Sequence, residues 1–172
     1  MRRLPDSLNA ILVQLFKRAP WLARRWARTH RFVEGADIPW TPVRKPVADS
    51  RVALVTTAGV HLTTQSPFDM EDPDGDPSYR IIPSGSPQAA LAITHKYYDH
   101  SAADRDINVV LPLDRLRELA AERQVGGIGP FVYGFMGHIT ARHLRTLMDT
   151  SAPEVARRLR ADGVDAVLLA PA

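Results

Sequence analysis

The folded domain is predicted to begin with Arg51-Val-Ala-Leu-Val-Thr-Thr-Ala58, a run that is closed by Gly59. Short apolar and β-branched runs of this kind are typical of buried strands in parallel sheets. Further strands are predicted at 89–94, 107–111, 131–135 and 166–170, and helices at 112–123, 140–148 and 153–161. Because strands alternate with helices, we predict a three-layer α/β fold with a mostly parallel, Rossmann-like sheet.

Two stretches of this region are predicted to be irregular. Residues 62–89 are rich in Pro, Asp, Gly and Ser, so we expect them to form a functional or covering loop. The loop's acidic cluster lacks the later glutamate of an EF-hand and is interpreted as turn residues. Gly126-Gly-Ile-Gly129 precedes a strand instead of linking a strand to a helix, which predicts a turn and not a phosphate-binding loop.

The first 50 residues differ from the rest of the chain. Residues 1–32 are predicted to form a basic, amphipathic helical leader hinged at Pro20, and residues 33–50 a proline-rich connector. Eight basic side chains and one acidic side chain lie in residues 1–31, against 14 basic and 18 acidic in the remainder. The domain at 51–172 is therefore mildly acidic, which argues against a nucleic-acid-binding fold. We favour packing of the leader on its own domain or on a twin subunit over binding to a membrane surface.

Composition excludes several classes of protein. A chain of 172 residues that is 45% hydrophobic and 24% charged has the makeup of one globular domain. None of these residues is a cysteine, which excludes a disulfide framework or a cysteine nucleophile within them. The longest apolar run, residues 10–16, is shorter than the ~20 residues of a membrane-spanning helix, and basic residues follow it where a signal-peptide cleavage site would lie. A cytoplasmic location is therefore expected.

Polar side chains follow several predicted strands. His61 comes after the first strand, Tyr97 after the second and His138 after the fourth. Because the carboxyl ends of parallel strands share one edge, where ligands bind in α/β folds, we expect these three side chains to approach one another there. Each histidine taken alone is better explained by a structural hydrogen bond.

Two histidine pairings resemble metal-ligand spacings. His95 and Asp99 are four residues apart, and His138 and His143 are five apart. Neither pair matches a known zinc pattern or has a third ligand close in sequence. We therefore predict no metal site.

Several motifs occur in an order that resembles a known family. They are Gly59-Val-His-Leu-Thr-Thr-Gln-Ser-Pro-Phe-Asp69, Asp76-Pro-Ser-Tyr-Arg80, His95-Lys-Tyr-Tyr-Asp99, Asp106-Ile-Asn-Val-Val-Leu-Pro-Leu-Asp-Arg-Leu-Arg-Glu-Leu119, Phe135-Met-Gly-His-Ile139 and Asp162-Gly-Val-Asp-Ala-Val-Leu-Leu169. This order is similar to the selenoprotein B family of glycine, sarcosine, betaine and D-proline reductases. The resemblance covers about residues 51–172 and leaves out the leader.

The resemblance implies reductive cleavage of a carbon–nitrogen bond. In the family, a selenolate or thiolate attacks the α-carbon of a small amino-acid-like substrate and the amine leaves. In the best-known members of the family, a separate subunit with a pyruvoyl group activates the amine. The family's selenocysteine or cysteine directly follows the strand that corresponds to 166–170, so the resemblance implies that it comes just after Ala172. We accordingly expect no cofactor within the chain itself, and a partner reductase subunit or a homo-oligomer.

The position of Ala172 leaves two interpretations of the chain. The sequence is either the amino-terminal part of a selenoprotein whose selenocysteine codon was taken as a stop, or a genuine truncated paralogue. A chalcogen at a strand-to-helix junction is activated by the dipole of the following helix. The first interpretation therefore predicts a reactive group there, and the second a catalytically silent binding or assembly subunit.

Roles for individual residues follow from the resemblance. His61 or His138 would protonate the departing amine or steady the anion, and together with Tyr97 they are the candidate catalytic residues. Arg80 is the candidate anchor for a substrate carboxylate, with a solvated loop charge as the equal alternative. A metal-dependent hydrolase that uses the histidines is a weaker third hypothesis.

Overall fold

The computed structural model describes residues 11, 15, 16, 18–29 and 41–172, and the chain divides into two compact units, residues 1–42 and 43–172. In the first unit, α2 spans Pro20–Thr29, with the proline in the first helical turn, where its missing N–H costs nothing. Residues 1–10, 12–14, 17 and 30–32 of the predicted leader and residues 33–40 of the predicted connector lie outside the described residues, so both assignments stay predictions. Among the helices that are described, none has the length and apolar character needed to cross a bilayer.

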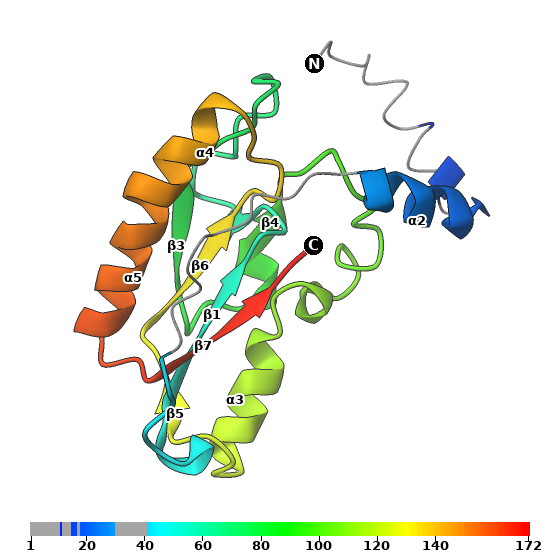
Figure 1. The fold of residues 1–172 in the computed structure, drawn as a ribbon. Helices are drawn as coiled ribbons and strands as arrows, with labels where there is room; N and C mark the ends of the chain where they lie inside the picture. The colour runs from blue at the N-terminus through cyan, green and yellow to red at the C-terminus, as the bar shows by residue number, and fades with distance from the viewer. Residues whose placement is uncertain (1–10, 12–14, 17, 30–40) are drawn as a thin grey trace. The chain divides into compact units, whose positions relative to one another are not determined.

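The second unit is built on a mixed sheet (Figure 1). Its strands are β1 (Arg51–Thr56), β3 (Tyr79–Pro83), β5 (Gly127–Ile128), β6 (Phe131–Phe135) and β7 (Ala166–Ala170). β7 pairs in parallel along β1, whereas β5 and β6 pair in parallel with the two ends of β1 on its other side. β3 pairs antiparallel with β6. The prediction of a mostly parallel α/β sheet is therefore confirmed, and the Rossmann-like connectivity stays a prediction.

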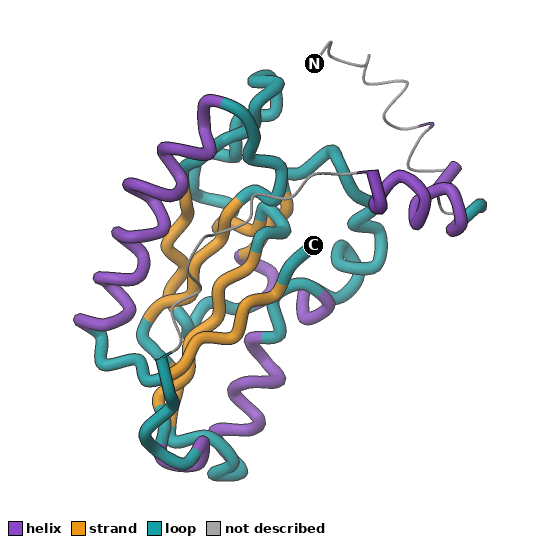
Figure 2. Tube along the Cα trace, viewed as in Figure 1, coloured by secondary structure: helices purple, strands orange, loops and turns teal. Residues whose placement is uncertain are grey.

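Helices cover both faces of the sheet, as Figures 1 and 2 show. On one face, α3 (Leu113–Ala121) packs in a core with Val52 and Leu54, and on the other α5 (Ala152–Ala161) packs with Ala53 and Val55. The four β1 residues alternate between the two cores because successive side chains of a strand point to opposite faces. α4 (Arg142–Thr146) and a π turn, η4 (Leu147–Ser151), run directly into α5. The two helices predicted at 140–148 and 153–161 are thus one continuous helical run.

A second, small sheet lies beside the main one. It pairs β2 (Val60–Leu62) antiparallel with β4 (Leu91–Ile93), which follows the 3₁₀ turn η2 (Gln88–Ala90). Gly134 of β6 allows the close approach, because a Cβ atom there would lie 2.0 Å from the carbonyl oxygen of Val60. The strand predicted at 89–94 is therefore real but belongs to this separate sheet and not to the parallel one.

Other predictions were wrong in detail. The segment predicted as a strand at 107–111 is the 3₁₀ turn η3 (Ile107–Val109), whose N-terminus is capped by the Asp106 carboxylate accepting the Asn108 N–H. The apolar run 107–111 still buries Ile107 and Leu111, so its pattern fits a helical turn as well as a strand. The predicted loop 62–89 contains β3, and the glycine-rich turn contains β5. A short 3₁₀ segment, η1 (Val47–Asp49), precedes β1.

Candidate functional site

The carboxyl ends of β1, β6 and β7 meet at one edge of the sheet, which we call the carboxyl edge. Ala172 donates its N–H to the Thr57 hydroxyl at 3.2 Å. Gly137, just past β6, faces the same point, because a Cβ atom on it would lie 2.8 Å from the Thr57 carbonyl oxygen and 3.6 Å from the Ala172 carbonyl oxygen. Only glycine fits this approach of three chain segments without displacing backbone. Parallel pairing therefore brings three distant stretches of sequence together, as predicted.

A fourth segment at this edge is the end of β4, which belongs to the small sheet. The backbone N–H of Thr94 donates to the Gly59 carbonyl at 2.9 Å, which fastens the end of β4 to the chain leaving β1. Gly59 has φ +73°, and a Cβ atom there would lie 2.3 Å from the Thr94 carbonyl oxygen. This contact places His95, the next residue, with its Nε2 atom 3.3 Å from the position of a Cβ atom on Gly137.

His95 is a buried histidine with one ring nitrogen unused. Its side chain packs against Tyr98, with ring centroids 4.7 Å apart, and the residue is only 8% exposed. Nδ1 accepts the Tyr97 N–H at 3.1 Å, so the neutral ring carries its proton on Nε2. Nε2 is buried and has no hydrogen-bond partner among the described residues. Burial, and then the neighbouring His138 and His100, lower the His95 pKa to about 4, which keeps the ring neutral near pH 7.

Two of the predicted site residues are in direct contact. The rings of Tyr97 and His138 stack with centroids 4.0 Å apart and planes 31° apart. His138 Nε2 lies 3.1 Å from the carbonyl oxygen of Pro73, to which it donates, so Nδ1 is the lone-pair nitrogen of the neutral ring. The backbone bond from Tyr97 to His95 joins all three side chains into one group, the His95–Tyr97–His138 cluster.

His61 is held differently. Its Nδ1 donates to the Leu62 carbonyl at 2.8 Å, and its Nε2 accepts the Thr94 hydroxyl at 2.8 Å. The ring also meets the edge of Phe68, at 6.2 Å between centroids. Both ring nitrogens are therefore engaged, and Thr94, the neighbour of His95, links His61 to the cluster.

Arg80, on β3, binds the loop that precedes it. Its guanidinium donates to the carbonyl oxygens of Ser66 and Pro67 at 2.9 and 3.0 Å and to the Ser78 hydroxyl at 2.8 Å. It also lies 3.6 Å from the Asp76 carboxylate and 4.2 Å above the Phe68 ring. With its side chain only 14% exposed, Arg80 is occupied by protein groups and not by bulk solvent.

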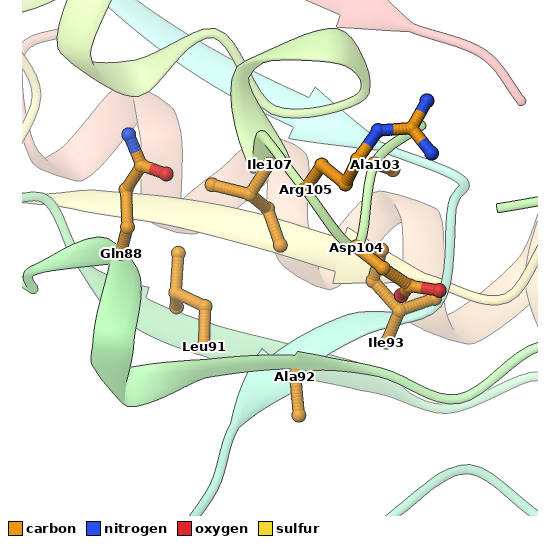
Figure 3. Close-up of a pocket in the computed structure, with 8 residues that line it drawn as sticks. All are labelled: Gln88, Leu91, Ala92, Ile93, Ala103, Asp104, Arg105 and Ile107. Atoms are coloured by element: carbon orange, nitrogen blue, oxygen red, sulfur yellow. The ribbon is translucent and has the colours of Figure 1, made fainter. Parts of the chain in front are cut away.

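A small cavity lies away from the cluster, between β4 and the segment leading into η3 (Figure 3). Its volume is about 130 Å³, and it is lined by Gln88, Leu91, Ala92, Ile93, Ala103, Asp104, Arg105 and Ile107. None of the four predicted site residues lines it, so the cavity is not the predicted site. Across the described residues, no three His, Asp or Glu side chains are grouped so that they would share a metal ion.

Sequence reasoning did not select His95 as a site residue, although the signal was present. His95 directly follows the strand predicted at 89–94, and the strand-exit rule that selected Tyr97 applies equally to it. What distinguishes His95 from His61 is the set of hydrogen-bond partners, and sequence does not show these partners.

Comparison with known proteins identifies relatives of the chain. The family model of glycine/sarcosine/betaine reductase selenoprotein B matches residues 29–172. D-proline reductase subunit gamma of Acetoanaerobium sticklandii is 39% identical over 130 residues, which cover 76% of this chain and 52% of that protein. Glycine reductase complex component B subunit gamma of Carboxydothermus hydrogenoformans is 28% identical over 135 residues, or 77% of this chain and 30% of that protein.

A third relative matches a shorter region. Betaine reductase complex component B subunit beta of Peptoclostridium acidaminophilum is 35% identical over 75 residues, which cover 44% of this chain and 16% of that protein. No solved structure matches the chain. The chain spans about half the length of the D-proline reductase subunit and less than a third of the other two relatives. The match over residues 29–172 shows that the chain belongs to the glycine/sarcosine/betaine reductase selenoprotein B family.

Proposed function

We propose that this chain is part of a reductase subunit that cleaves a carbon–nitrogen bond in a small amino-acid-like substrate. The subunit acts with partner subunits, one of which carries the pyruvoyl group that the resemblance implies. Family membership and 39% identity to a D-proline reductase subunit support the reaction class. The observation that carries the proposal is the convergence of Thr57, Gly137 and Ala172 with the His95–Tyr97–His138 cluster at the carboxyl edge.

The reacting group in this proposal is a selenol or thiol that follows Ala172. It supplies the nucleophile for reductive cleavage, while the electron pair of the broken bond leaves with the nitrogen. The residues present suit such a group, since His95 holds a buried N–H that has no acceptor among the described residues. This N–H and the Ala172 carbonyl both approach the position of a Cβ atom on Gly137. A cysteine or selenocysteine nucleophile must be the anion to react, and nearby hydrogen-bond donors favour the anion.

The chain's own residues divide the remaining tasks. His138 keeps a proton on Nε2 for the Pro73 carbonyl, which leaves Nδ1 to exchange a proton with the departing amine. Tyr97 orients that ring by stacking on it. His61, with both nitrogens engaged, is a weaker choice for proton transfer than His138. Arg80 would anchor a substrate carboxylate only after exchanging some of its contacts in the 66–78 loop.

The nucleotide sequence and an activity assay test the proposal. An in-frame TGA codon after the Ala172 codon, followed by an open frame that encodes a cysteine, is the expected result. The extended protein, supplied with its partner subunits and a dithiol, should then release the amine from glycine, sarcosine or betaine, or open the ring of D-proline. The 172-residue chain should not, because it contains no thiol or selenol. Turnover by the 172-residue chain at the rate of the extended protein would refute the placement of the nucleophile.

The absence of cysteine from all 172 residues supports a second candidate, a catalytically silent binding or assembly subunit of the same fold. An ordinary stop codon with no coding continuation favours this alternative. Purification of the native complex separates the two cases, because a silent subunit would remain bound to a reductase whose thiol or selenol lies on another chain.

A further inference from the structure

A buried hydrogen-bond donor lies at the carboxyl edge without an acceptor. His95 Nε2 is the one buried side-chain nitrogen or oxygen in the described part of the chain that has no partner. Leaving such a group unpaired forfeits its hydrogen bonds to water without a replacement, so folded proteins rarely keep one without a reason. The position of this donor therefore indicates a hydrogen bond to an acceptor that the described residues do not supply.

Contacts with neighbouring residues fix the donor in place. The Nδ1 bond to the Tyr97 N–H and the packing on Tyr98 set the orientation of the ring. A Cβ atom on Gly137 would lie 3.3 Å from Nε2 and 3.6 Å from the carbonyl oxygen of Ala172. Gly137 and Ala172 are both exposed, so the chain leaves Ala172 at the surface, beside the Cβ position that His95 Nε2 and the Ala172 carbonyl both approach.

The chemistry of the donor selects the kind of acceptor. A neutral imidazole N–H stabilises a nearby anion by a charge-assisted hydrogen bond but does not give up its proton, which suits a nucleophile that must stay ionised. Resting on the function proposed above, we propose that His95 Nε2–H donates a hydrogen bond to the reductase's thiolate or selenolate at the carboxyl edge. His95 is then the residue that positions and stabilises the nucleophile, while proton transfer belongs to His138.

The test measures the ionisation of the nucleophile directly. In the extended protein, with cysteine at the nucleophile position, the pH dependence of alkylation by iodoacetamide gives the thiol pKa. His95→Leu should raise that pKa by about one unit, a roughly tenfold loss of thiolate at a pH below both values. His95→Gln, which keeps an N–H donor, should recover part of the shift. His143→Gln is the matched control, because His143 contacts Asp72 and Arg142 and not the cluster.

A second measurement covers the case in which His95→Leu does not fold. In the wild-type extended protein, the ¹⁵N and ¹H resonances of His95 Nε2–H should shift when the thiol is alkylated. In the 172-residue chain, they should not respond to added acetate. A response to acetate without a response to alkylation would make a substrate carboxylate the acceptor and overturn the proposal.

The outcomes separate this proposal from the function on which it rests. An unchanged thiol pKa in a folded His95→Leu variant, or an equal shift in His143→Gln, refutes the role of His95 even if the complex is an active reductase. A shifted pKa in a complex that cleaves none of the four substrates supports His95 and refutes the proposed reaction. A continuation that contains neither cysteine nor selenocysteine refutes both.

Discussion

The close contact between Gly59 and Thr94 gives a strong test of how the site is built. We consider Gly59→Ala. The residue has φ +73°, a conformation that costs an L-amino acid about 1–2 kcal/mol. The new Cβ atom would also lie 2.3 Å from the Thr94 carbonyl oxygen and 3.2 Å from the His95 Cβ. Relief of such overpacking typically costs a further 1–3 kcal/mol.

The expected loss in the free energy of unfolding is therefore about 2–5 kcal/mol. Urea denaturation of the 172-residue chain, followed by far-ultraviolet circular dichroism, measures it. Gly85→Ala is the matched control, since a Cβ atom there meets nothing within 4 Å and Gly85 does not have positive φ. That control should change the free energy of unfolding by less than about 0.5 kcal/mol.

The same substitution should also disturb the candidate site. Moving Thr94 away from Gly59 moves His95, so the Tyr97 N–H would lose or lengthen its bond to Nδ1. The amide resonance of Tyr97 reports this change. A loss below 1 kcal/mol together with an unshifted Tyr97 amide would show that the β4 end is not held by Gly59, and the account of how His95 reaches the edge would be wrong.

Three further predictions concern pH and association. The His95 pKa of about 4 lies below the unfolded value near 6.5, so its contribution to stability is complete above pH 6.5 and is lost as the pH falls through 4. Over this pH range, the free energy of unfolding of the wild type, measured by urea titration, should fall by up to about 3 kcal/mol more than that of His95→Gln. If the free energies of the two proteins fall in parallel with pH, the burial of a neutral ring is contradicted. A hydrogen bond from His143, and then one from the Asp74 backbone N–H, lower the Asp72 pKa to about 2. Asp72→Asn should therefore flatten the decline in the free energy of unfolding from pH 4 to pH 2. An unchanged decline over this pH range would contradict the prediction. Leu169 is 67% exposed on β7, which has one neighbouring strand in the described sheet. Leu169→Lys should therefore reduce self-association, measured by sedimentation velocity. Equal sedimentation of the wild type and the variant would show that this edge does not associate.

Much of the second unit is predictable because burial follows local periodicity. β1 and β6 are continuous apolar runs that are buried along almost their whole length, as expected of strands covered on both faces. In α3, the buried Leu113 and Leu116 recur at helical spacing. β3 was not predicted, because its residues are mostly half-buried and it follows a stretch rich in Asp, Pro and Gly, which locally favours turns. The segment that forms η3 was predicted to be a strand because its apolar run fits a strand equally well. The Asp106 carboxylate, which caps the segment at its N-terminus, favours the turn.

The candidate site divides in the same way between sequence and tertiary structure. From the sequence alone, His61, Tyr97 and His138 were expected to approach one another where parallel strands end. Tyr97 and His138 are in contact, but Tyr97 follows β4, which belongs to the separate antiparallel sheet. The difference between His61 and His95 came only from the tertiary structure. Pairing of β2 with β4 sets the Thr94 hydroxyl against His61 and leaves His95 Nε2 without an acceptor. Hydrogen-bond partners depend on which backbone segments pack together over long sequence separations, and no local pattern of residue types encodes that choice.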